Sequence, residues 1–312
     1  MRFLGTAAPG RTVGNGTVGN LVAFALLCAF LALGSAAAHA QGISLTTTGT
    51  YSQNFDSLFT SGTAWTNGVT LSGWYAERAG GTAAAGVIPS LIIGSGSSNT
   101  GGVYNFGVSG TSGAALDRAL GSAGSGTPGN LAYGVEFRNS AAAGTALTLG
   151  TLTYTGEQWR NGGNATAQPL SLWYRISNTD LTSGLFLSPS DSAAWTQLSA
   201  LTFTSLQNTI TAAALDGNAT ANRTTLSLDL GSLINVGAGQ YVAFRWLDIN
   251  DAGTDHGLAI DDFSLNYTVS SLAASSLFWT ANGSSLGGSG TWGSGNTWSP
   301  TESPVSGGAF DS

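Results

Sequence analysis

An acidic stretch between positions 248 and 262 holds residues that could bind a cation. Five of the sixteen acidic residues of the sequence lie within it. Oxygen ligands on a glycine-containing loop suit Ca²⁺, although the Glu that closes an EF-hand loop is absent. The alternative is a turn in which Asp and Asn side chains bond to nearby backbone N–H groups. The candidate ligands in this loop are Asp248, Asn250, Asp251 and Asp255.

Asp261 is a second residue whose side chain would need a partner. It alternates with Ala259, Phe263, Leu265, Tyr267 and Val269, which predicts that it faces inward with them on one side of a strand. A buried carboxylate without a partner costs several kcal/mol or becomes protonated. Asp261 therefore needs an arginine, backbone donors or a cation, and the simplest alternative is a structural Asp that is already paired.

Glu157 and Trp159 form a third candidate pair. Residues two apart on a strand point to the same face, so these side chains lie together. An exposed Trp beside a carboxylate could bind a sugar ring, which makes both residues candidate ligands for a glycan. The alternative is that Trp159 belongs to the core, because Trp is highly buried on average.

Catalysis has little support in the sequence. Nucleophilic catalysis by a Ser-His-Asp arrangement would have to use His256, and no Gly-x-Ser-x-Gly motif is present. A glycosidase would need two carboxyls facing one cleft, and Glu77, Glu136 and Glu157 are the acids outside the Asp-rich stretch that could contribute. No phosphate-binding loop or dinucleotide fingerprint occurs.

The elements that would position these residues are short strands. Apolar residues alternate with polar ones over 147–154, 172–177, 226–230 and 242–247, with Gly, Ser, Asn and Thr between the runs. Period two with turn residues between runs is the signature of strands. We therefore expect an all-β antiparallel sandwich of the jelly-roll type over residues 41–270.

The N-terminus predicts export. Arg2 and Arg11 precede an apolar run of 14 residues, and Ala38-His39-Ala40 gives the small-x-small pattern of a Sec-type cleavage site. The run is short for a transmembrane helix, although an uncleaved anchor is the alternative. We expect residues 1–40 to be a signal peptide, cleavage after Ala40, and a secreted or cell-surface protein without a transmembrane segment.

Composition limits the partners and the sources of stability of the exported chain. Removal of the leader would leave 7 Arg against 16 Asp and Glu, a formal charge of −9, and no Cys. This balance argues against a nucleic-acid partner, because no basic stripe exists. A disulfide framework and a Cys-rich zinc site are excluded, so stability would come from core burial and from any bound ion.

Residues 271–312 differ in composition from the predicted sandwich. After a small-residue linker, Phe278-Trp279 and Thr297-Trp298 stand in Gly- and Ser-rich sequence, as in one turn of a β-solenoid repeat. One repeat cannot bury its own face. We expect either the truncated start of a repeat array or an unstructured tail.

An ordered series of motifs runs along the predicted sandwich: Tyr51–Leu58, Gly73–Tyr75, Tyr104–Gly107, Asp117–Gly121, Tyr154–Arg160 and Asp255–Leu265. The series resembles the N-terminal module of large exported bacterial surface proteins that carry autotransporter-associated β-strand repeats or PEP-CTERM-type tails. Its opening Asn-Phe-Asp and closing Ala-Ile-Asp-Asp-Phe are also similar to MAM-type jelly rolls of the concanavalin-like class.

The MAM-type likeness implies a shared ion between the first and last strands. The matching acids here are Asp56 and either Asp261 or Asp262. The cysteines typical of animal MAM domains are absent, so no disulfide carries over.

Together these observations predict a non-catalytic extracellular module for adhesion or surface display, stabilised by calcium. An alternative is a lectin-like module that binds an extracellular glycan or another cell-surface partner. It would use exposed rings among Trp65, Tyr75, Trp159 and Trp173. A carbohydrate-active hydrolase or lyase is the third alternative.

Overall fold

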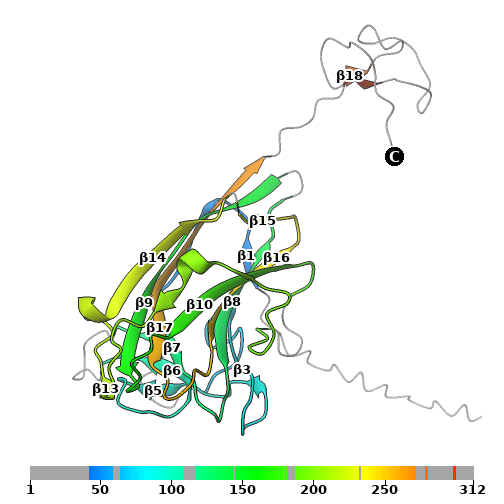
Figure 1. Ribbon diagram of the computed structural model, residues 1–312. Helices are drawn as coiled ribbons and strands as arrows, with labels where there is room; N and C mark the ends of the chain where they lie inside the picture. The colour runs from blue at the N-terminus through cyan, green and yellow to red at the C-terminus, as the bar shows by residue number, and fades with distance from the viewer. Residues whose placement is uncertain are drawn as a thin grey trace, which may run out of the picture. The chain divides into compact units, whose positions relative to one another are not determined.

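The described residues between 42 and 271 form an all-β domain of two packed sheets (Figure 1). The computed structural model describes residues 42–58, 64–108, 117–142, 145–180, 187–231, 233–271, 278–279 and 298–299. The predicted signal peptide therefore lies outside the described residues. Helical structure among them is limited to two 3-10 turns, η1 (Ser199–Leu201) and η2 (Thr220–Asn222). The described part of the chain contains no helix with the length and apolar content that a bilayer crossing requires.

Sheet A has eight strands among the described residues, in the order β11-β10-β16-β8-β3-β4. Strand β1 pairs with β8 in parallel, β12 pairs with β10, and the other pairs are antiparallel. The strands are β1 (Ile43–Leu45), β3 (Trp74–Arg78), β4 (Gly86–Val87), β8 (Leu131–Asn139), β10 (Pro169–Ser177), β11 (Thr196–Gln197), β12 (Phe203–Thr204) and β16 (Tyr241–Asp248).

Sheet B has nine strands among the described residues, in the order β13-β9-β17-β7-β6-β5. Strands β14 and β15 also pair with β9, and β2 pairs with β17. The strands are β2 (Gly49–Gln53), β5 (Ile92–Gly94), β6 (Gly102–Phe106), β7 (Ala119–Ala123), β9 (Thr145–Asn161), β13 (Ala213–Ala214), β14 (Arg223–Asp229), β15 (Asn235–Val236) and β17 (Gly257–Ser271).

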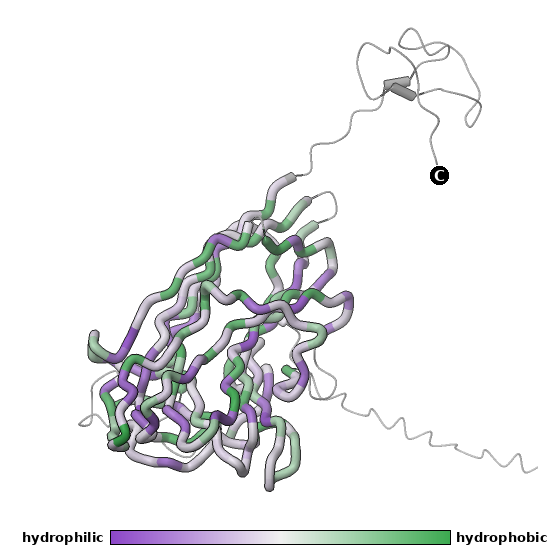
Figure 2. Tube along the Cα trace, in the orientation of Figure 1, coloured by the Kyte–Doolittle hydropathy of each residue, from purple (hydrophilic) through white to green (hydrophobic). Residues whose placement is uncertain are grey.

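The predicted alternation is confirmed in β10, β14 and β16. In β16, Val242, Phe244 and Trp246 face the main core, because successive side chains of a strand point to opposite faces. The intervening Ala243 and Leu247 join a second cluster on the outer face of sheet A. Figure 2 shows hydrophobic and hydrophilic residues following one another along the strands.

Aromatic side chains from both sheets fill the centre of the core. Trp74 and Trp246 of sheet A stack with ring centroids 5.8 Å apart. Phe263 of sheet B meets each of these rings edge-on at 5.7 Å. Such pairs add about 0.5–1.5 kcal/mol each beyond the area that they bury, so this cluster holds the two sheets together without any disulfide.

The C-terminal segment contains one described strand pair. Strands β18 (Phe278–Trp279) and β19 (Trp298–Ser299) are antiparallel, and Trp279 is the register partner of Trp298. The remaining residues of 272–312 lie outside the described part of the chain, so the solenoid repeat stays a prediction.

Candidate cation site

 Strand β2 runs antiparallel to β17 with Gln53 opposite Phe263, so the residues after β2 continue toward Asp262. Asp56 lies there. Its Oδ1 accepts the backbone N–H of Arg118 at 3.1 Å and its Oδ2 accepts the amide of Asn54 at 2.6 Å. Burial and the charge of Asp117 raise the pKa of Asp262, and the charge of Asp56 adds a smaller contribution. That Asp56 shares an ion with Asp261 or Asp262 stays a prediction.

A β-bulge at Asp262 corrects the predicted face of Asp261. Asp262 has a φ of 49°, and the register between β17 and β9 shifts between Asp261 and Ser264. A bulge inserts one residue and reverses which face the following residues occupy. Phe263 therefore joins the main core, whereas Ala259 packs in a cluster on the outer face of sheet B. The prediction that Ala259, Asp261 and Phe263 share an inward face is wrong.

Asp261 and Glu157 form a buried acidic pair on that outer face. Asp261 is 2% exposed and Glu157 is 0% exposed. Oδ1 of Asp261 accepts the backbone N–H of Asp262 at 2.7 Å. Burial, and next the charge of Glu157, raise the pKa of Asp261 well above its usual range. Burial raises the pKa of Glu157 to about 7.

One oxygen of this pair has no hydrogen-bond partner. Oε2 of Glu157 accepts the indole N–H of Trp159 at 2.8 Å, whereas Oε1 is buried and accepts nothing. An unpaired buried charge is costly. Glu157 is therefore either protonated or compensated by a cation, and its orphaned oxygen is the observation that points to a ligand here.

Two residues that the sequence did not single out as ligands complete the electrostatic surroundings. The charge of Asp117 raises the pKa of Glu157, Asp261 and Asp262. Arg223 is the register partner of Glu157 on β14, and its charge lowers the pKa of Glu157 and Asp262. The sequence pointed to Asp117 only as the first residue of the motif Asp117–Gly121, and the position of Arg223 depends on strand pairing.

The donor set suits a hard cation such as Ca²⁺, which takes six to eight oxygen ligands. Glu157 and Asp261 are buried, while Asp56, Asp117 and Asp262 are exposed. Within the described residues, however, no three acidic, His or Cys side chains are close enough together to form a ready-made metal-binding group. The carboxylate oxygens of these residues suit the ion. To complete its ligands, the exposed side chains of Asp56, Asp117 and Asp262 would have to turn toward the buried pair.

The Asp-rich loop belongs to a separate group. Asp248 is 3% exposed, and its Oδ2 accepts the hydroxyl of Ser122 at 2.6 Å, which links β16 of sheet A to β7 of sheet B. Burial raises its pKa to about 8, and the charges of Asp255 and Asp251 add to the shift.

The turn alternative accounts for the rest of that loop. Oδ1 of Asp255 accepts the backbone N–H of Asp251 at 2.9 Å, so an Asp side chain of the loop bonds to a nearby backbone N–H, although four residues apart rather than at the spacing of an Asx turn. The backbone N–H of Asn250 donates to Oδ1 of Asn130 at 3.0 Å. Burial raises the pKa of Asp255 to about 6 and also raises that of Asp251. These contacts make the loop a folded turn without requiring an ion.

His256 is also structural. It is 1% exposed, its Nδ1 accepts the backbone N–H of Gly162 at 2.9 Å, and its Nε2 lies 3.3 Å from the carbonyl of Thr166. This arrangement fits the neutral imidazole with its proton on Nε2. Burial lowers the pKa of His256, which favours that neutral form.

The predicted sugar platform at Trp159 is not available. Trp159 is 0% exposed and stacks on Phe106 with ring centroids 5.7 Å apart and an interplanar angle of 2°. A Cβ added to Gly217 would lie 2.3 Å from its indole ring, so the backbone at Gly217 covers it. Trp65 and Tyr75 are buried as well, and Trp173 is half-buried.

No family model and no curated protein sequence matches the chain. Solved structures that resemble it include a cleaved adhesin domain of Lys-gingipain from Porphyromonas gingivalis W83, at 15% identity over 70% of this chain and 98% of that chain, with a TM-score of 0.33. A xylan-binding domain from Paenibacillus barcinonensis is 11% identical over 72% of this chain and 97% of that chain, with a TM-score of 0.28.

A glycoside hydrolase domain structure from Streptococcus pneumoniae R6 is 14% identical over 72% of this chain and 28% of that chain, with a TM-score of 0.30. Adhesin, carbohydrate-binding and hydrolase domains thus all occur among these neighbours. At such low TM-scores they do not discriminate between functions for this chain.

Proposed function

We propose that this protein is a non-catalytic, exported jelly-roll module of a bacterial surface protein that acts in adhesion or surface display. The observation that carries the proposal is the burial of the side chains that could do chemistry. Glu157, Asp248 and Asp261 are at most 3% exposed. A glycosidase needs two carboxyls that reach the sugar from one cleft, and buried carboxyls of this kind serve the fold.

Export is supported by the leader. The apolar run before Ala40 has the length of a signal peptide rather than of a transmembrane helix. A secreted domain without cysteines must be stabilised by burial or by ligands. The aromatic core between the sheets supplies burial, and the acidic pair would supply a ligand site.

We further propose that calcium stabilises the module at the acidic pair. Glu157 and Asp261 would hold the ion, with Asp56, Asp117 and Asp262 as the exposed acids that complete the charge. The support is the orphaned Oε1 of Glu157 beside a second buried carboxyl. Bound calcium would neutralise these charges and remove the cost of burying them.

Expression of the complete chain with its own leader in a bacterial host tests export. The account predicts an exported protein whose N-terminus is Gln41, accessible to added protease on intact cells. Retention in the cytoplasm with the leader intact would contradict it. Incubation with a panel of polysaccharides tests the absence of catalysis, and cleavage that is lost in Glu157→Gln would show that the protein is an enzyme.

A further inference from the structure

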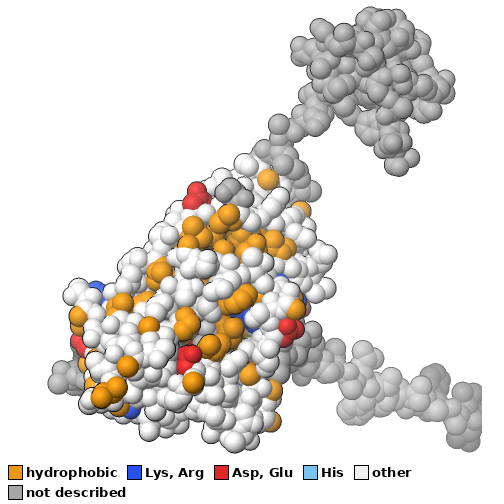
Figure 3. Space-filling view, viewed as in Figure 1, with side chains coloured by type: hydrophobic (Ala, Val, Ile, Leu, Met, Phe, Trp, Pro, Cys, Tyr) orange, Lys and Arg blue, Asp and Glu red, His pale blue; other side chains and the backbone are white. Residues whose placement is uncertain are grey.

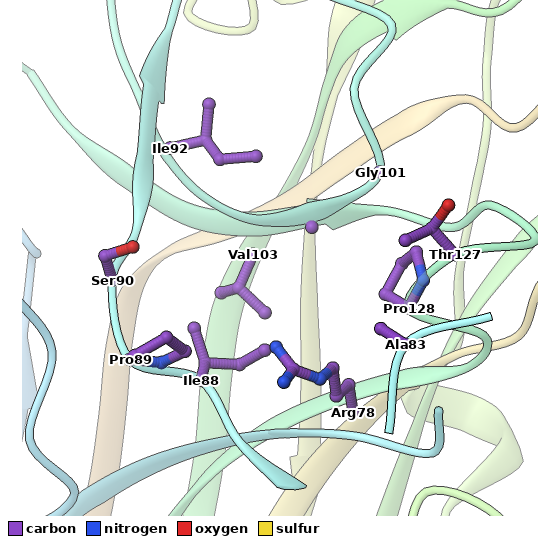
Figure 4. A pocket seen from close by; sticks show the side chains of 11 residues that line it. Arg78, Ala83, Ile88, Pro89, Ser90, Ile92, Gly101, Val103, Thr127 and Pro128 are labelled. Atoms are coloured by element: carbon purple, nitrogen blue, oxygen red, sulfur yellow. The ribbon is translucent and has the colours of Figure 1, made fainter. Parts of the chain in front are cut away.

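A hollow of about 190 Å³ lies where the chain passes from the edge of sheet A to the edge of sheet B. Its lining comes from the end of β3, the segment between β4 and β5, the start of β6, and the turn before β8. Figure 4 shows the Arg78 side chain at this hollow, with its guanidinium directed toward Ile88 and with Val103, Ile92 and Pro128 around it. The hollow is separate from the acidic pair and from the Asp-rich loop.

Arg78 brings a positive charge that the lining does not balance. Its Nε donates to the carbonyl of Ala84 at 2.8 Å, and no hydrogen bond from its two terminal nitrogens is found among the described residues, so both are available to a ligand. None of the residues that line the hollow is acidic. A guanidinium offers a planar pair of donors that matches a carboxylate. In a chain with an excess of acids, such a cation favours an anionic ligand at this point.

The walls beside Arg78 are aliphatic. Ile88 is 4% exposed and Val103 is 1% exposed, and Ile92 and Pro128 continue the apolar surface. Aromatic rings, which would stack on a sugar, are absent from the residues that line this hollow. The group attached to the anion should therefore be a small apolar one.

A strand edge runs beside the same hollow. Strand β5 is the last strand in the order of sheet B, and among the described residues it pairs only with β6. Ile92 of β5 is part of the lining. An open edge presents backbone donors and acceptors to which an extended peptide can add as a further strand.

We propose that this hollow binds the C-terminal end of a polypeptide whose last residue is apolar. The terminal carboxylate would pair with Arg78, the last side chain would lie among Ile88, Val103 and Pro128, and the preceding residues would extend along the edge of β5. Charge, apolar walls and strand edge each match a different part of such a ligand. The site goes beyond the proposed surface module and depends neither on its calcium nor on its lack of catalysis.

The test uses the full mature chain and a fluorescently labelled pentapeptide of glycine and serine that ends in valine. Fluorescence anisotropy should detect binding of the free acid. The C-terminally amidated peptide should bind at least about tenfold more weakly. Arg78→Gln should weaken binding of the free acid to the level of the amidated peptide, and Arg78→Lys should restore part of it. Arg175→Gln, which removes a half-buried arginine of β10, should change nothing.

Ala83→Leu provides a second variant that narrows the hollow without touching Arg78, and it should also weaken binding. Equal binding of the free and amidated peptides would overturn the proposal. Galacturonate that binds at this site and is not displaced by the peptide would also overturn the proposal. Neither result would bear on export or on calcium, which the preceding experiments test separately.

Discussion

Trp159 donates its indole N–H to Oε2 of Glu157 at 2.8 Å while both side chains lie fully buried on the outer face of sheet B. The hydrogen bond fixes the orientation of the carboxyl. It also leaves Oε1 without a partner. The contact therefore explains why these two residues serve the fold rather than sugar binding, and why the carboxyl still needs a proton or a cation.

Replacing Glu157 tests the cost of its charge. Glu157→Gln keeps an acceptor for Trp159 and removes the repulsion with Asp261, so with chelator at pH 8 it should raise the free energy of unfolding by on the order of 2 kcal/mol. Urea unfolding measures the change. Glu157→Ala, which leaves a cavity and an unpaired indole N–H, should instead lower stability by about 2–4 kcal/mol. Loss of stability in both variants would count against a costly charge.

The pH dependence of stability should show the buried Asp248. Burial raises its pKa in the folded state to about 8, above the ordinary value of 3.8, so the folded state holds the proton more tightly. The stabilisation of the folded state by this proton is complete below about pH 4 and is lost as the pH rises through about 8. With chelator, the thermal midpoint should therefore fall between pH 5 and pH 8.5. Asp248→Asn, which can still accept the Ser122 hydroxyl, should make that slope shallower; an unchanged slope would contradict the assignment.

The bulge at Asp262 predicts an ordered response to substitution. A φ of 49° is easy for glycine and costly for a β-branched residue. In the presence of chelator, Asp262→Gly should be neutral or stabilising by up to about 1 kcal/mol, and Asp262→Val should be destabilising by about 1–3 kcal/mol. Differential scanning calorimetry measures both. Equal stability of the two variants would mean that the left-handed backbone conformation is not retained.

Arg245 should be a major support of the loop that covers sheet A. Its guanidinium is buried and donates to the carbonyls of Leu187, Ser188 and Asp191, and it lies 4.4 Å from the ring centroid of Trp195. Arg245→Met should lower the free energy of unfolding by about 2–4 kcal/mol, because these carbonyls lose a charged donor. Arg175→Met on the neighbouring strand is the matched control and should cost less than about 1 kcal/mol.

The surface in Figure 3 carries few charges. On this face the charged side chains are separated from one another, and several hydrophobic side chains gather in one patch. The low content of charged residues was visible in the sequence. Its arrangement in space was not, because residues that meet on a sheet surface come from distant parts of the chain.

Much of the fold could be predicted from period-two alternation. The runs around Leu172, Leu226 and Phe244 are strands β10, β14 and β16, as expected. For the run through Asp261, alternation predicts the wrong face of the strand. A single bulge residue in the left-handed conformation reverses the faces without changing the pattern of residue types.

The candidate site was only partly predictable. The proximity of Asp56 and Asp262 is an expectation from the MAM-type resemblance. Glu157 is a candidate from the sequence as a neighbour of Trp159 in a sugar site, not as a ligand of an ion. Asp117 and Arg223 reach the site through pairings between distant strands, which local patterns do not encode. The cover over Trp159 comes from the backbone near Gly217, 58 residues further along the chain, so its burial could not be read from its own neighbours.

Thermal unfolding of the exported protein with chelator and over 0 to about 10 mM calcium tests the central claim most directly. Binding to the folded state alone must raise the midpoint in proportion to the logarithm of calcium once its concentration exceeds Kd. We predict this rise for the wild-type chain, a much smaller one for Glu157→Gln and Asp261→Asn, and no loss of it for Asp255→Asn. A midpoint that stays constant over the whole range would contradict a calcium-stabilised module.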